Sequence, residues 1–210
     1  RGNKLDYDTW AQLGNTGWSY DDVLPFFKKI ENYQGEITEV RSTEGPLKIS
    51  EVVDRNPIYE GLFKGADEIG IPINKDYNGH EQEGISYTQT TIFKGERMSA
   101  EVAYLRPIRS RKNLKIITNS LVTKLIFDGK TCKGVKVKNK NKITDFFAQN
   151  EVILCGGAIN SPQILELSGI GNRSLLEEKG ISLVHELKGV GENLRDHLGP
   201  RLVYNIAKRG

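Results

Sequence analysis

The sequence contains few residues that bind metals or form disulfides. Its 210 residues include two cysteines, Cys132 and Cys155, and three scattered histidines. Two cysteines are too few for a disulfide scaffold, and together with the histidines they show no zinc-ligand spacing, so we expect no metal site. Both cysteines lie in or beside apolar, strand-like runs, which favours buried, reduced thiols in a cytosolic protein over a disulfide.

Long apolar runs and a strong charge of one sign are also missing. No apolar stretch approaches the about 18 residues that a membrane span needs, and no apolar signal segment follows the first residues. The 30 basic and 27 acidic residues leave a net charge of +3, a weak argument for nucleic acid or an anionic membrane as partner. We therefore expect a soluble, cytoplasmic protein with no membrane span and no nucleic-acid partner.

Three common functional motifs are absent from the sequence. No serine has glycines two positions away on both sides, which excludes a nucleophile elbow, and the P-loop spacing is missing. The pairs in Gly169–Gly171 and Gly189–Gly191 each supply half of a G-x-G-x-x-G motif. Ser174 and Leu194 stand where the third glycine would be. Neither pair is a dinucleotide fingerprint.

Composition and capping signals indicate a loop-rich α/β protein. Apolar residues make up 37% of the chain, which also has 22 glycines. Ser19 is a candidate N-cap, acidic residues follow it and Lys28 and Lys29 come near the end of the pattern, so we predict a helix over residues 19–33.

Five further elements are predicted before residue 113. They are a strand over 46–50, a helix from Asn56-Pro57 to Gly70, a polar loop over 73–86, a strand over 87–93, and a helix that starts at Ser99 and is kinked or ended by Pro107. Long loops in compact domains are often functional, so we expect the polar loop to line a pocket.

From Asn113 onward the sequence reads as successive strands. Turns are predicted at Asp128-Gly129 and around 139–141. In the segment 134–138, valines and lysines alternate, so they point to opposite sides. We interpret the lysines as the solvent face of an edge hairpin rather than a nucleic-acid surface, because no aromatic residues are interleaved with them.

The most patterned stretch runs from Glu151 to Gly171. Residues 151–155 are continuously apolar after the first, which predicts a strand buried on both faces. The small residues Gly156, Gly157 and Ala158 would let the backbone approach a ligand closely. A helix start after them would direct N–H groups at an anion or a polarised carbonyl. On these residues alone, a cofactor loop and a packing turn both stay open.

The expected helix in this stretch has its own boundary signals. Asn160 or Ser161 is a candidate N-cap with Pro162 in the first helical position, and Gly169 is expected to end the helix in the left-handed conformation.

Residues 157–171, GAINSPQILELSGIG, resemble the second signature of the glucose-methanol-choline (GMC) oxidoreductases, FAD-dependent enzymes that act mostly on alcohols. Other blocks follow in the family's order: RGNKLDYDTW with GNTGWSYDDVLPFFKKIE, then GERMSAEVAYLRP, NLKIITNSLVTKLIF and GVGENLRDH. Together they are most similar to the choline dehydrogenase-like members.

This resemblance implies a fold class and a division of the chain. The fold would be α/β with α+β, a partial FAD-binding domain of the GMC type plus part of an antiparallel-sheet substrate domain. Residues 1–45 and 96–198 would belong to the FAD-binding domain and 46–95 to the substrate domain, with 199–210 starting its next strand. The family's dinucleotide fingerprint precedes the segment matching Arg1 and its catalytic histidine follows the position matching Gly210. We therefore expect an internal fragment, inactive by itself.

The resemblance also implies a cofactor, a substrate and contact residues. The cofactor would be FAD, and the reaction a hydride transfer from a small-molecule alcohol to the flavin. In the family the backbone of the valine matching Val122 contacts the adenine. Gly156–Ala158 would lie near the FAD, and Asn3 and Trp10 would approach the flavin side.

Several alternatives remain open at this level. His80, His185 and His197 receive no catalytic role, and we interpret His197 as structural. A non-catalytic binding module on the same scaffold is the alternative function. The particular alcohol, oxygen or another carrier as electron acceptor, a membrane association through that acceptor, and the oligomeric state are not decided.

Overall fold

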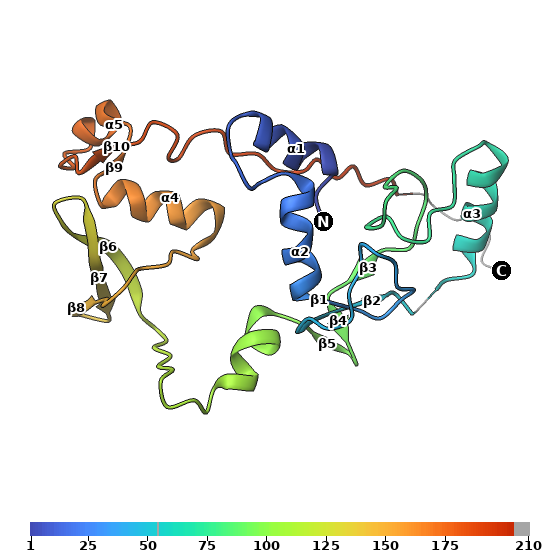
Figure 1. The fold of residues 1–210 in the computed structure, drawn as a ribbon, viewed down its shortest axis with the longest axis horizontal. Helices are drawn as coiled ribbons and strands as arrows, with labels where there is room; N and C mark the ends of the chain where they lie inside the picture. Colours follow the sequence, from blue (N-terminus) through green and yellow to red (C-terminus); the bar gives the residue numbers. More distant parts are fainter. Residues whose placement is uncertain (54, 204–210) are drawn as a thin grey trace. The chain divides into compact units, whose positions relative to one another are not determined.

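The structure is a computed structural model that describes residues 1–53 and 55–203 (Figure 1). The chain forms two compact units, Arg1–Lys115 and Ile116–Gly210. Both combine helices with small sheets. In the described part of the chain, no helix is long and apolar enough to cross a membrane.

Two helices open the first unit. Helix α1 (Lys4–Gln12) is capped by Asn3, whose side chain accepts the Leu5 N–H at 2.9 Å; the sequence patterns had not predicted it. Helix α2 (Tyr20–Ile30) starts after Ser19, which forms a capping box with Asp22. The predicted start is confirmed, but the end at residue 33 is wrong because residues 31–33 form a strand.

The strands of the first unit are short. Strand β1 (Glu31–Tyr33) pairs in parallel with β2 (Leu47–Glu51), which pairs antiparallel with β3 (Gln89–Thr90). Strands β4 (Ile92–Phe93) and β5 (Glu96–Arg97) form a separate hairpin. The strand predicted over 87–93 is therefore split by a bend at Thr91, where the pairing partner changes from β2 to β5, and a turn at residues 94 and 95, both with positive φ, ends β4.

The remaining elements of this unit match their predictions with one change of type. Helix α3 (Ile58–Glu68) is followed by Gly70 at φ +79°, and residues 73–86 form the predicted loop, held at its base by a bridge between Ile73 and Ile85. The predicted helix after Ser99 is a π-helical turn, η1 (Glu101–Leu105), and Pro107 falls in a 3₁₀ turn, η2 (Arg106–Ile108).

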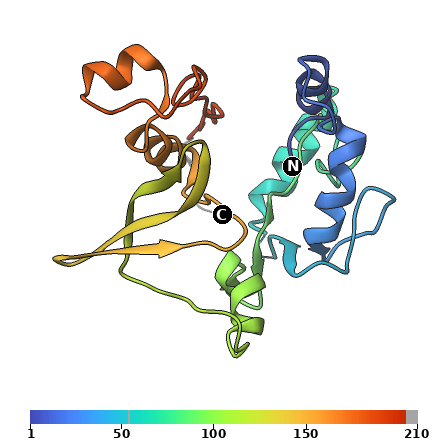
Figure 2. The same cartoon turned by 60° about the vertical axis from the view of Figure 1, so that its left-hand side comes forward.

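An antiparallel sheet forms the base of the second unit (Figure 2). Its strands are β6 (Leu121–Asp128), β7 (Thr131–Asn139) and β8 (Lys142–Phe147), in the order β6-β7-β8. Both predicted turns are present. The expected edge hairpin is confirmed as β7 and β8, of which β8 is the edge strand, and the lysine run lies on the inner strand β7; Lys136 pairs with Asp145 on β8 at 2.7 Å.

Helix α4 (Gly157–Leu167) packs against β6, and a small lobe follows it. The lobe contains β9 (Ile170–Gly171), α5 (Arg173–Glu178) and β10 (His185–Glu186), with β9 and β10 parallel. The helix begins at Gly157, so neither Asn160 nor Ser161 is its N-cap and Pro162 lies inside it. The predicted left-handed end is confirmed, since Gly169 has φ +90°.

Residues 151–155 do not form the predicted buried strand. Among the described residues they have no ladder partner, and Ile153 is 72% exposed. The stretch at Ile116 and Ile117, also predicted as strand, is likewise unpaired and exposed in this part of the chain. A strand buried on both faces needs a neighbour on each side, and the described residues supply none. For the same reason Cys155 is exposed rather than buried, while Cys132 is half-buried.

Candidate functional site

The small-residue turn before α4 leaves its backbone open. Gly157 has φ +84°, and no atom of residues 1–53 or 55–203 lies within 4 Å of the position a Cβ would take. The Gly156 N–H donates to the Ser161 hydroxyl at 3.0 Å, and Ala158 is exposed. The first turn of an 11-residue helix, with its partial positive charge, is thus reachable by a ligand.

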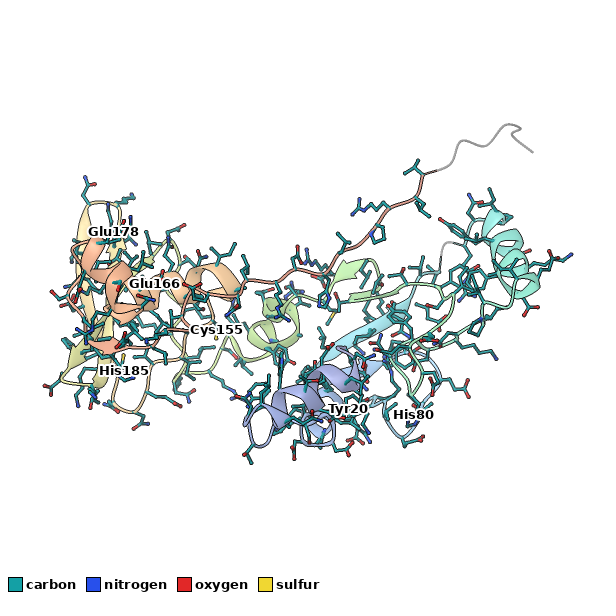
Figure 3. All side chains as sticks on the ribbon, turned by 90° about the horizontal axis from the view of Figure 1, so that it is seen from above. Tyr20, His80, Cys155, Glu166, Glu178 and His185 are labelled. Carbon is teal, nitrogen blue, oxygen red and sulfur yellow. The ribbon has the colours of Figure 1, made fainter. Side chains whose placement is uncertain are left out.

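A cavity of about 480 Å³ runs along this helix. Its lining includes Ala158 from the first turn of the helix, Glu166 (labelled in Figure 3) and both glycines of the segment 189–192. A Cβ on Gly191 would lie 2.5 Å from the Glu166 carboxylate, and the backbone of Gly191 has φ +80°, which favours glycine. In the pair Gly189–Gly191, half of a fingerprint in the sequence, Gly191 thus lies against α4.

Val122 lies on the strand that α4 contacts. It is half-buried near the start of β6, opposite Val137, and a register shift follows it before Lys124. The contact between α4 and β6 is fixed by Ser168, whose hydroxyl accepts the Leu125 N–H at 2.8 Å. Val122 and the Gly156–Ala158 turn are therefore on two elements joined by direct contact.

Asn3 lines a separate cavity of about 470 Å³ in the first unit. Its amide donates to Gln82 at 2.6 Å, which ties the start of α1 to the polar loop. The loop thus lines a pocket, as the sequence predicted, and Tyr20 and His80 lie on the same cavity (Figure 3).

His80 has a partner that sequence could not name. Its Nε2 lies 2.6 Å from Glu39 Oε1, across 41 positions of the chain. Two hydrogen bonds lower the pKa of the Glu39 carboxyl group. The larger effect comes from the backbone N–H of Glu39 and the next from the side chain of His80. Both side chains are exposed, which makes the pair a weak tether.

Trp10 lies in an exposed aromatic groove on α1 and α2. Its ring makes edge contacts with Tyr7 at 5.4 Å and with Trp18 at 5.8 Å, and it remains 46% exposed. The groove has a volume of about 610 Å³. Asn3 and Trp10 therefore line different cavities of the first unit.

A buried ionic cluster was missed by sequence reasoning. Glu31 is 3% and Arg41 is 2% exposed, and Arg41 lies 3.2 Å from Glu31 and 3.6 Å from Asp76. The Arg41 guanidinium stacks over the Tyr33 ring at 3.7 Å. Burial first, and then the carboxylates of Asp76 and Glu51, raise the pKa of Tyr33 to about 12.

This cluster borders a third cavity, of about 520 Å³. Its residues come from positions far apart in the sequence, so no local motif could reveal them. Within residues 1–53 and 55–203, no three acidic, histidine or cysteine side chains gather in a way that could hold a metal ion. His185 and His197 are both exposed.

Comparison with known proteins identifies the class to which this site belongs. Residues 1–199 match the sequence profile of the family described as GMC oxidoreductase. Human mitochondrial choline dehydrogenase is 41% identical over 198 residues, which cover 94% of this chain and 33% of that protein. Oxygen-dependent choline dehydrogenase of Brucella anthropi is also 41% identical, over 94% of this chain and 36% of its own length.

Solved structures show the same fold. An FAD-dependent oxidoreductase from Chaetomium thermophilum superimposes with a TM-score of 0.88 at 34% identity, over 93% of this chain and 36% of that one. Pyridoxine 4-oxidase from Mesorbium loti superimposes with a TM-score of 0.81 at 30% identity, over 89% of this chain and 37% of that one.

The chain belongs to the GMC oxidoreductase family. It spans about a third of the length of the relatives it matches. The expected fold class, mixed α/β with antiparallel sheets of the GMC type, is confirmed.

Proposed function

We propose that this chain is part of an FAD-dependent alcohol oxidoreductase of the choline dehydrogenase type. The observation that carries the proposal is the 41% identity to two choline dehydrogenases over 94% of the chain. The substrate class is a small-molecule alcohol. The relatives' names include both a mitochondrial and a bacterial, oxygen-dependent enzyme, so the acceptor and the cellular location are not part of the proposal.

The residues of the second unit fit a bound FAD. The turn Gly156–Ala158 carries no side chain larger than a methyl group, and a Cβ at Gly157 would meet none of the described residues. Backbone N–H groups at such a start suit the oxygen atoms of a phosphate or of a flavin carbonyl. Val122 is proposed to hold the adenine through its backbone, on the strand that α4 contacts.

Asn3 and Trp10 are proposed to approach the flavin side. Asn3 offers a side-chain amide that is oriented by its hydrogen bond to Gln82, and Trp10 offers a half-exposed ring. Residues 1–45 and 96–198 are assigned to the FAD-binding domain and 46–95 to the substrate domain. The strand predicted over 199–210 lies partly outside the described residues, and residues 199–203 form no strand.

The chemistry divides between the cofactor and the chain. When bound, FAD supplies the capacity to accept a hydride from the alcohol carbon. The role of this chain is to bind and orient the cofactor, with backbone groups at Gly156–Ala158 and Val122 and with the side chains of Asn3 and Trp10. None of the three histidines is proposed as a catalytic base.

The test uses the protein expressed from its complete reading frame. Purified without added cofactor, it is expected to show flavin absorbance bands. Under anaerobic conditions, choline or another small primary alcohol is expected to bleach those bands, and a thiol or an amine of similar size serves as control.

Two outcomes contradict this proposal. A colourless protein that also fails to take up added FAD removes the cofactor and favours the non-catalytic binding module. A flavoprotein whose bands are not bleached by any alcohol keeps the cofactor and removes the substrate class.

A further inference from the structure

Ser168 occupies an unusual place in the second unit. It is the last residue of the turn that ends α4, it is 1% exposed, and its hydroxyl bridges two elements. The hydroxyl donates to the Ile164 carbonyl in α4 at 2.5 Å and accepts the Leu125 N–H from β6 at 2.8 Å. A single oxygen atom therefore joins the end of the helix to the strand.

The bond matters because β6 is at the edge of its sheet. Leu125 is itself buried, so its N–H would lie without a partner in an apolar environment if the hydroxyl were missing. The Ile164 carbonyl does not depend on the side chain in the same way, because it also accepts the backbone N–H of Ser168 at 3.1 Å. The strand-to-helix bond is thus the specific contribution of the Ser168 side chain.

The hydrogen bond between Ser168 and Leu125 lies at the opposite end of α4 from the helix start, so a small tilt there displaces the start. Gly157 lies 11 residues before Ser168, about 16 Å away along the helix axis. A tilt of about 5° about the link would move the Gly156–Ala158 turn by about 1.4 Å at this length. Displacements of this size are enough to weaken hydrogen bonds to a bound group.

We infer that Ser168 is a positioning residue of the cofactor site: its hydroxyl holds α4 on β6 at the inclination that places the Gly156–Ala158 turn correctly relative to Val122. This inference rests on the proposed function. It assigns a role to a side chain that touches neither the cofactor nor the substrate.

The experiment compares variants of the complete protein after removal of FAD. Ser168→Ala is expected to weaken FAD binding about tenfold, equivalent to about 1.4 kcal/mol, and to change the visible circular dichroism of the bound flavin. Ser168→Cys keeps a weakly accepting atom at this place and is expected to fall between Ser168→Ala and the wild type. Fluorescence titration gives the affinity, well below the melting temperature of each variant.

Two controls separate positioning from stability. Ser174→Ala makes the same change at an exposed serine of α5, and Leu176→Val weakens the core of the same unit at a residue 1% exposed, without touching the link. Both are expected to bind FAD within about twofold of the wild type and to leave the flavin spectrum unchanged.

Three results are decisive against the inference. Wild-type affinity and spectrum in Ser168→Ala overturn it directly. An equal loss of affinity in Leu176→Val, at an equal fall in melting temperature, reduces Ser168 to a purely structural residue. Failure of the wild type itself to bind FAD removes the proposed function and this inference with it, a result distinct from the first two.

Discussion

Single residues in the first unit show how a polar core is held together. Glu31 and Arg41 are charged, yet they lie where apolar side chains usually pack, and the half-buried Asp76 lies beside them. Their burial is tolerated because each carboxylate faces Arg41 and because the guanidinium also stacks on Tyr33. Without Arg41, Asp76 would lose its ion-pair partner and Glu31 would keep only Arg1.

We therefore expect Arg41→Ala to lower the free energy of unfolding by about 3–5 kcal/mol. The matched change Arg109→Ala removes an arginine whose side chain is 65% exposed and that pairs with Glu101 at 3.4 Å, and it is expected to cost less than about 1 kcal/mol. Urea unfolding of both variants measures the difference. Equal effects at the two positions would contradict a stabilising role for the buried cluster.

Tyr33 gives this cluster a pH dependence at alkaline pH. Its pKa is about 12 in the folded protein, compared with about 10 in an unfolded chain, so folding favours the neutral phenol. The raised pKa of Tyr33 contributes to the free energy of unfolding in full below about pH 10, and this contribution is lost as the pH rises from there towards 12. The contribution is roughly 2–3 kcal/mol at most.

The wild type is accordingly expected to lose more stability than Tyr33→Phe between about pH 10 and pH 12. Unfolding midpoints of the two proteins over this range provide the measurement, because other titrating groups affect both equally. Parallel curves would show that the phenol titrates normally in the folded state.

At the scale of elements, the start of α4 depends on a glycine conformation. Gly157 has φ +84°, which side chains rarely adopt, although the space around it is open. Gly61 lies inside α3, where a Cβ would also meet nothing, and its φ is not positive. The two positions thus differ in backbone conformation and not in available space.

Opposite effects are expected from alanine at these two glycines. Gly157→Ala is expected to destabilise the second unit by about 1–2 kcal/mol because of the left-handed backbone. Gly61→Ala is expected to stabilise α3 by about 0.5–1 kcal/mol. Thermal unfolding of each variant tests this, and a stabilising Gly157→Ala would rule out the strained helix start.

Helix and turn signals in the sequence were reliable where the cause was local. The capping box at Ser19, the turn at Asp128-Gly129 and the left-handed Gly169 all depend on neighbours within a few residues. The start of α4 was misplaced because Ser161, a good capping residue, bonds back to Gly156 from inside the helix. The prediction of a strand over 151–155 was wrong for another reason, because strand pairing depends on segments far away in the sequence.

At the scale of the whole molecule, apolar side chains are exposed on several elements. They lie on the unpaired stretches and on β8: Ile116, Ile117, Ile153, Ile143 and Phe147. Exposed strand edges and apolar residues of this kind promote association.

We expect the 210-residue chain by itself to bind a hydrophobic dye and to form oligomers at micromolar concentration. The protein from the complete reading frame is expected to do so much less. Dye fluorescence and light scattering at matched concentration compare the two, and a monomeric, dye-negative 210-residue chain would contradict the expectation.

Ordered local blocks and short-range capping and turn chemistry were sufficient to predict the family, the antiparallel hairpins and most helix positions. Which residues meet depends on the tertiary packing. It brought Glu31, Arg41 and Asp76 into one buried cluster, His80 to Glu39, and Ser168 to the edge of β6. These contacts join positions up to 43 residues apart. Contacts across such separations follow from how the elements pack, which no local pattern encodes.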